Sequence, residues 1–177
     1  NHQDKDQLSD SLEQTIEQLA VPQLYGMMLH REALLDLWDK GLGETLLNFV
    51  RSGKVQKIGV SVSSPDYALQ AINTDGIDLI QVPSNIMDRR FETVGVFQLA
   101  QQLKKKIYIR SVFLQGLLLM NPDNLLAKLQ HTAPVLRQFE QLCAKLNLTK
   151  QGLALGYLKL AIPGAKIVFG AECPEQV

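Results

Sequence analysis

The chain has 177 residues, enough for one well-buried domain but fewer than the roughly 250 that a closed eight-unit α/β barrel usually needs. Its 18 basic and 18 acidic residues balance and no stretch is densely basic, so we expect no nucleic-acid partner. No apolar run approaches the roughly 20 residues that span a bilayer, and the polar, acidic start does not resemble a secretory signal. We therefore expect no membrane partner.

Cysteine and histidine usage narrows the chemistry further. The two cysteines, Cys143 and Cys173, are too few for a disulfide framework, which favours a reducing, cytoplasmic location. The chain contains no HxH, HExxH or CxxC spacing, so we predict no metal site.

The first predicted elements are a helix, a strand and a second helix. Asp10 and Glu13 have the spacing of a capping pair, which predicts a helix start there. The apolar run LYGMMLH predicts a strand that ends on His30. A helix is then predicted over 43–52, with Gly53 as its left-handed stop.

The middle of the chain continues the alternation. The apolar run VQKIGVS predicts a strand that ends on Ser61. Ser64 and Pro65 supply an N-cap and a first-turn proline, which predict a helix start. The next strand, over 78–82, contains Gln81.

The remaining elements follow the same pattern. In chain order they are a helix over 92–105, a strand over 107–112, helices over 132–147 and 150–161, and a strand over 166–169. Strands that alternate with helical segments predict an α/β fold with a parallel sheet. In a parallel barrel the carboxyl ends of the strands share one face, where such enzymes place their chemistry.

Several polar or small residues stand at these strand ends. His30 can donate to a carbonyl oxygen or exchange a proton near neutral pH, although a lone histidine is also common as a structural or solvated residue. The side chains of Ser61, Gln81 and Asn85 can bind a planar carboxamide, or can instead satisfy the backbone of nearby loops. Gly170 precedes a potential helix start at Pro174, where free N–H groups favour an anion.

Five segments together resemble the carboxyl-terminal part of an aldo-keto reductase, in the family's order and over nearly the whole chain. They are LHR at 29–31, GKVQKIGVS at 53–61, IQVPSNIMDRR at 80–90, RSVFLQGLLL at 110–119 and VFGAECPEQV at 168–177. The sequences of these segments are most similar to those of a branch of reductases associated with surface-polysaccharide and sugar-nucleotide pathways. The resemblance implies part of a (β/α)8 TIM barrel that moves hydride between NADP(H) or NAD(H) and a small-molecule carbonyl substrate, without a metal.

The resemblance also implies a role for individual residues. His30 matches the histidine of the catalytic tetrad, which orients the substrate carbonyl and assists the acid. Ser61 and Gln81 match residues that hold the nicotinamide carboxamide. The remaining matches lie on the loop that crosses the pyrophosphate (Ser111, Leu114 and Gly116) and where the family grips the adenosine ribose or its phosphate (Gly170, Glu172 and Gln176).

The chain departs from the family pattern in three ways that bear on its expected activity and cofactor. The acid tyrosine and its aspartate and lysine partners belong upstream of the LHR strand and are not among these residues; Tyr25 lies inside the strand and is no substitute. Val62 replaces an asparagine that is common beside the matching serine. Glu172 stands where many members have a serine or a basic residue, so a carboxylate would repel a 2′-phosphate and accept from a ribose 2′-OH, and we expect NADH to compete with NADPH.

We therefore predict a single domain over 1–177, the carboxyl-terminal portion of a barrel that lacks the amino-terminal strands and the final helix. Such a chain is expected to be a poor carbonyl reductase by itself, and its exposed sheet edges favour self-association. Two alternatives remain open at this point. One is a non-catalytic domain that keeps the barrel scaffold for binding or assembly, and the other is a different barrel enzyme, such as an isomerase or lyase.

Overall fold

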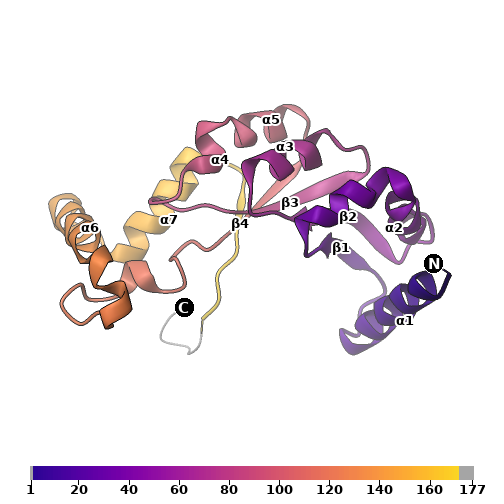
Figure 1. Ribbon diagram of the computed structural model, residues 1–177, viewed down its shortest axis with the longest axis horizontal. Helices are drawn as coiled ribbons and strands as arrows, with labels where there is room; N and C mark the ends of the chain where they lie inside the picture. The colour runs from indigo at the N-terminus through magenta and orange to yellow at the C-terminus, as the bar shows by residue number, and fades with distance from the viewer. Residues whose placement is uncertain (1, 172–177) are drawn as a thin grey trace. The chain divides into compact units, whose positions relative to one another are not determined.

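The protein is described by a computed structural model that covers residues 2–171, with side chains from residue 7 onward (Figure 1). Five strands form one sheet in the order β1-β2-β3-β4-β5, and the β1–β2, β2–β3 and β4–β5 pairs are parallel. The strands are β1 (Leu24–Leu29), β2 (Val55–Ser61), β3 (Ile77–Pro83), β4 (Lys106–Arg110) and β5 (Lys166–Ile167).

Helical segments connect the strands, as the sequence pattern predicts. The α-helices are α1 (His2–Gln18), α2 (Leu42–Arg51), α3 (Pro65–Asn73), α4 (Arg90–Thr93), α5 (Val96–Gln102), α6 (Ala133–Leu146) and α7 (Lys150–Ala161). Three 3₁₀ segments are added, η1 (Glu32–Lys40), η2 (Leu117–Leu119) and η3 (Ala127–Thr132). The predicted α/β class, a partial (β/α)8 barrel with parallel strands alternating with helices, is confirmed.

The chain divides into two compact units, and each combines two separate stretches of sequence. The first unit runs to Gln81 and includes Gln98–Lys106, whereas the second consists of Val82–Phe97 and the chain from Ile107 onward. Each unit is described by itself below.

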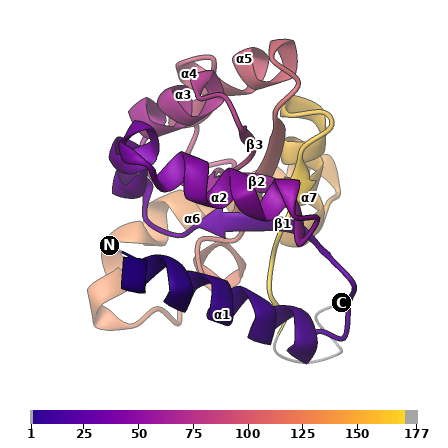
Figure 2. The same ribbon diagram turned by 90° about the vertical axis from the view of Figure 1, so that its right-hand side faces the viewer.

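The core of the first unit lies between the sheet and helices α2 and α3. Strands β2 and β3 read as nearly continuous apolar runs because both of their faces are covered, as expected for parallel strands. Helix α2 packs against β2 and η1 (Figures 1 and 2). Gly59 is required where β2 approaches β3, since a Cβ there would lie 2.5 Å from the backbone oxygen of Leu79.

Two helix ends in the first unit form as the sequence predicts. Gly53, at φ +76°, ends α2, and its N–H donates to the Val50 carbonyl while the N–H of Lys54 reaches back to Phe49. Ser64 is the N-cap of α3, where its hydroxyl accepts from the N–H of Tyr67 at 3.2 Å, and Pro65 occupies the first turn.

Four predicted boundaries are wrong. The strand predicted over 166–169 ends at Ile167, and the other three differences each have a local reason. Helix α1 already begins at His2, so Asp10 lies inside it and is no cap. The helix predicted over 92–105 is two helices, because Gly95 adopts φ +78° between α4 and α5. The strand predicted over 107–112 ends at Arg110, because Ser111 leaves the extended region with φ +59°.

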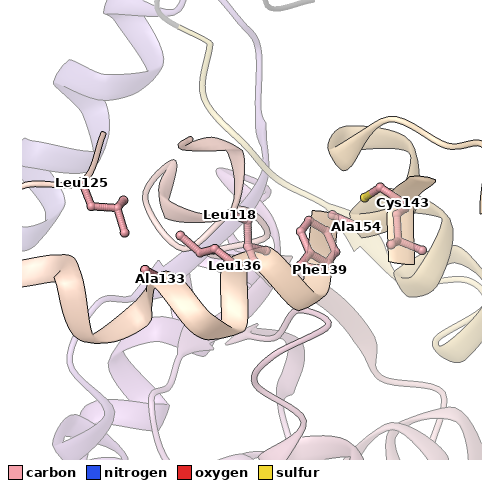
Figure 3. Close-up of a cluster of buried hydrophobic side chains, with 8 residues drawn as sticks. Leu118, Leu125, Ala133, Leu136, Phe139, Cys143 and Ala154 are labelled. Carbon is pink, nitrogen blue, oxygen red and sulfur yellow. The ribbon is translucent and has the colours of Figure 1, made fainter. Parts of the chain in front are cut away.

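The second unit has its own apolar cluster, built around helix α6 (Figure 3). Ala133, Leu136, Phe139 and Cys143 recur along one side of α6 and pack with Leu118 and Ala154. This spacing of three or four residues places them on one face of the helix. Leu125, Leu153 and partly buried apolar residues of the 113–117 loop complete the cluster, which therefore supports the loop that follows β4.

Candidate functional site

The first unit brings three predicted site residues into one row across neighbouring strands. Leu29 of β1 pairs with Val60 of β2, so His30 and Ser61 are the next residues along two adjacent strands. Ser61 in turn pairs with Gln81 of β3. Neighbouring strands lie about 4.8 Å apart, so the parallel sheet gathers residues that are 51 positions apart in sequence.

A hydrogen bond joins two members of this row. The Ser61 hydroxyl donates to Oε1 of Gln81 at 3.0 Å; Ser61 is buried, with 8% of its surface exposed, and Gln81 is partly buried. The amide NH₂ of Gln81 makes no hydrogen bond within the part of the chain that the structure describes. It is therefore an oriented donor, suited to the carbonyl oxygen of a planar carboxamide.

His30 begins the loop after β1, and its side chain is exposed. His30 therefore does not fill the core, and its exposure fits both a ligand-facing and a solvated residue. Val62, next to Ser61, is fully buried, and its N–H donates to the Gln81 carbonyl oxygen at 2.9 Å. The position that the family resemblance associates with an asparagine is thus part of the apolar core in this chain.

Sequence reasoning missed the role of Glu32, which lies two residues after His30. Its carboxylate accepts hydrogen bonds from the backbone N–H groups of Ser63 and Ser64, just beyond Ser61. An acidic residue two positions after a predicted strand-end histidine was the available signal, but its partner Ser63 is 31 residues away and only the fold reveals it.

In the second unit, Asn85 organises the loops after β3 and β4. Its side chain is 1% exposed; Oδ1 accepts from the N–H groups of Met87 and Asp88, both at 2.9 Å, and Nδ2 donates to the Ser111 carbonyl at 3.1 Å. Ser84 adds a backbone hydrogen bond to the Arg110 carbonyl at 3.2 Å. All of the Asn85 hydrogen bonds therefore go to backbone, which is the loop-satisfying alternative for this residue.

The loop that Asn85 anchors contains unusual backbone geometry. Ser111, Leu114, Gln115 and Gly116 all have positive φ, at +59°, +49°, +55° and +88°. Only Gly116 adopts this region without a steric penalty. Non-glycine residues in the left-handed region cost of order 1–3 kcal/mol each and cluster at ligand-binding loops. The strained positions include Ser111 and Leu114, two of the three loop residues that the sequence resemblance implies, and the third, Gly116, has a positive φ without strain.

The end of β5 meets this loop within the second unit. The rings of Phe113 and Phe169 contact edge to face, with centroids 5.7 Å apart, so Gly170 follows directly after a residue that touches the loop. Gly170 is exposed and a Cβ there would meet no atom within 4 Å. Glu172 and Gln176 lie outside the described residues.

The charged residues of the DRR segment form ion pairs. Arg90 holds Asp88 with two side-chain hydrogen bonds of 2.9 and 2.8 Å, and this guanidinium lowers the pKa of the Asp88 carboxyl. Arg89 holds Glu92 in the same way, and Glu92 also accepts a hydrogen bond from the hydroxyl of Tyr157. Burial, followed by the Glu92 contact, raises the pKa of Tyr157 to about 12. The contact of Tyr157 with Glu92 joins α4 to α7, and the two exposed guanidinium groups pair with carboxylates two or three residues away.

A cavity of about 350 Å³ lies against α7 and β5 in the second unit. Its lining is apolar apart from Lys159 and includes Phe169 but none of the predicted site residues. We assign no chemistry to it, because it presents no converging polar groups.

The described residues contain no cluster of three or more His, Cys, Asp or Glu side chains placed to hold a metal ion. Among them, too, no helix is both long and apolar enough to cross a membrane.

Comparison with known proteins gives one consistent result. The model of the Aldo/keto reductase family matches residues 4–177. A comparison with curated proteins found no similar sequence.

Similar solved structures include a glycerol dehydrogenase from Gluconobacter oxydans, with a TM-score of 0.77 and 20% identity over 98% of this chain and 57% of that one. An aldo-keto reductase from Bacillus halodurans in its apo form has a TM-score of 0.77 and 20% identity, over 97% of this chain and 60% of that one. An aldo/keto reductase from Klebsiella pneumoniae, solved with NADP and acetate, has a TM-score of 0.68 and 19% identity, over 96% of this chain and 56% of that one. The chain thus spans a little under two thirds of each of these structures, and at such identities the likeness shows the fold.

Proposed function

Because the chain belongs to the aldo/keto reductase family, we propose that the protein reduces an aldehyde or ketone with NADPH or NADH. The observation that carries this proposal is the row of His30, Ser61 and Gln81 across three parallel strands, with Ser61 hydrogen-bonded to Gln81. In this row His30 follows β1, the oriented carboxamide of Gln81 lies two strands away on β3, and Ser61 lies between them. Such a row suits a nicotinamide and a carbonyl group.

The roles follow from the donors that the row offers. When bound, the nicotinamide supplies a hydride to the carbonyl carbon. The Gln81 NH₂ would donate to the nicotinamide carboxamide oxygen, and the Ser61 hydroxyl holds Gln81 in that orientation. His30, exposed at the strand end, would donate to the substrate's carbonyl oxygen and favour the negative charge that develops there.

The second unit supplies the proposed pyrophosphate loop. The left-handed residues Ser111 and Leu114–Gly116 turn the backbone sharply, and such strain persists where a loop is shaped for a ligand. We also assign Gly170, Glu172 and Gln176 to the adenosine ribose or its phosphate. The carboxylate of Glu172 would favour the ribose hydroxyl of NADH over the 2′-phosphate of NADPH.

The general acid that the family resemblance implies is not among these residues. The tyrosine, aspartate and lysine that complete the tetrad have no counterpart in the 177 residues. General-acid catalysis contributes about 10²–10⁴-fold, so we propose that this chain by itself binds cofactor but turns over slowly. A sugar-derived carbonyl in the reducing cytoplasm fits the sequence branch and the low cysteine content best.

Two measurements on the protein test this function. Binding of NADPH and of NADH is followed by the fluorescence of the cofactor. It should be saturable, and Gln81→Ala should weaken it. His30→Ala should depress aldehyde reduction far more than cofactor affinity, because His30 faces the carbonyl. Equal losses in both would remove the assigned role of His30, and absence of cofactor binding would favour the non-catalytic binding or assembly domain.

A further inference from the structure

We propose that Glu32 is a positioning residue that fixes the loop carrying His30 against the loop carrying Ser61. The role rests on the proposed function, since it concerns the spacing of those two side chains. Nothing in the motif pattern assigns this residue, and its side chain is partly buried at the start of η1.

The contacts of Glu32 are directed at one short stretch of backbone. Its Oε2 accepts from the N–H of Ser63 and from the N–H of Ser64, the latter at 3.1 Å. Ser64 is the N-cap of α3, so the carboxylate lies at the positive end of that helix, where a negative charge is favoured. Hydrogen bonds to a charged group are stronger and more directional than neutral ones, and here one oxygen holds two successive amides.

The pairing of β1 with β2 shows which two loops the contact joins. Strands β1 and β2 run parallel, and Leu29 and Val60 are their last paired residues. His30 and Ser61 follow at the same level, and Glu32 and Ser63 are each two residues further. The bridge thus closes the two loops at a fixed distance directly beyond the candidate site.

Without the bridge, the paired strands and the contact of Tyr67 with Asp36 would still join the two segments, but the carboxylate link to the backbone of Ser63 and Ser64 would be lost. The start of α3 would then be held less tightly to the loop after β1, and we expect His30 to shift relative to Ser61 and Gln81. A misplacement of about 1 Å can cost about 100-fold in rate when reacting groups must be aligned. We therefore expect the effect of losing Glu32 to appear in turnover rather than in folding.

A neighbouring contact provides a matched control. The hydroxyl of Tyr67 donates to Oδ2 of Asp36 at 3.0 Å, which also joins η1 to α3. Asp36 is exposed, and its carboxylate contacts the Tyr67 side chain rather than the backbone at 63 and 64. Asp36→Asn thus alters an acidic contact between the same two elements without touching the proposed bridge.

The experiment compares Glu32→Ala, Glu32→Gln and Asp36→Asn with the unaltered protein, using NADPH and 4-nitrobenzaldehyde. Active sites are counted by bound NADPH, folding is checked by circular dichroism, and amide exchange is followed at Ser63 and Ser64. We expect Glu32→Ala to lower kcat per NADPH site by about tenfold or more and to speed exchange at both amides. Glu32→Gln, which keeps an acceptor oxygen, should recover most of kcat, and Asp36→Asn should change neither quantity by more than about twofold.

Two results would overturn the inference. One is a Glu32→Ala protein whose kcat per NADPH site matches that of Asp36→Asn, which would make the bridge merely structural. The other is unchanged exchange at Ser63 and Ser64. Failure of the unaltered protein to bind NADPH is a different result, because it would remove the proposed function itself.

Discussion

Single buried side chains decide the shape of the loops next to the sheet. Asn85 is the clearest case, because its amide satisfies two backbone donors of its own turn and one carbonyl of the loop after β4. The sequence left two roles open for Asn85, contact with a ligand or with loop backbone. In the structure its side-chain hydrogen bonds all go to backbone. Its contribution to any ligand would be indirect, through the placement of Ser111.

Replacement of Asn85 by alanine should lower the free energy of unfolding by about 2–3 kcal/mol. The loss follows because the N–H of Met87 and the Ser111 carbonyl would lose their Asn85 partner, while the N–H of Asp88 would keep only the backbone carbonyl of residue 85. Urea titration at neutral pH measures it, with Asn73→Ala as the control, since Asn73 is exposed and bonds only the Leu69 carbonyl. A loss no larger than that of the control would contradict the prediction.

Helices in this chain begin and end where local chemistry permits. Gly53 ends α2 with φ +76°, whereas Gly156 lies inside α7 and does not have a positive φ. A Cβ would meet no atom within 4 Å at either position. The two glycines therefore isolate the effect of backbone conformation from that of packing.

Alanine at these two positions should therefore change the free energy of unfolding in opposite directions. Gly53→Ala should destabilise the protein by about 1 kcal/mol, because alanine is strained in the left-handed region. Gly156→Ala should stabilise it by about 0.5–1 kcal/mol, since alanine restricts the unfolded chain and favours helix. Thermal unfolding of both variants provides the measurement. Changes of the same sign would show that packing dominates at one of the sites.

The contact between α4 and α7 should make the free energy of unfolding depend on pH in the alkaline range. The pKa of Tyr157 is raised from 10 to about 12, so the folded protein favours the protonated hydroxyl. This contribution to stability is complete below pH 10 and is lost as the pH rises from 10 through about 12.

Tyr157→Phe tests that dependence, because it removes the titrating group and keeps the ring. The difference in unfolding free energy between the unaltered protein and this variant should be constant at pH 8–9 and shift toward the variant above about pH 10. Urea midpoints at pH 8, 9, 10 and 11 give the comparison, and the remaining tyrosines cancel in the difference. A difference that does not change with pH would rule out the proposed linkage.

At the scale of the whole molecule, the sheet has two outer strands. In the order β1-β2-β3-β4-β5, the free sides of β1 and β5 have no strand partner among the described residues. Val168 and Phe169, directly after β5, are both more than 40% exposed. Unpaired edges with exposed apolar side chains promote pairing with another chain, so we propose concentration-dependent self-association of this chain.

Val168→Lys should weaken that association, because an edge lysine disfavours a second strand. Sedimentation velocity over a range of concentrations compares it with Val135→Lys, which places the same charge on an exposed position of α6. We expect the first variant to shift the chain toward monomer and the second to leave the distribution unchanged. Equal behaviour of the two variants would mean that the β5 edge is not the contact.

The sequence by itself determined the elements and their class. Apolar runs, the Ser64–Pro65 cap and the Gly53 stop act through neighbouring residues, so they predict β2, α2 and α3 with small errors at the boundaries. It also placed His30, Ser61 and Gln81 at strand ends, since the carboxyl ends of parallel strands share one face.

Only the tertiary structure decided which of these side chains meet. The bond of Ser61 to Gln81, the bridge from Glu32 to Ser63 and Ser64, and the commitment of Asn85 to the Ser111 carbonyl all join residues 20 or more positions apart. The register of neighbouring strands sets such contacts, and register depends on the packing of the whole sheet rather than on local propensity. The left-handed Ser111 and Leu114 have the same origin, because strain of this kind persists only where surrounding contacts impose it.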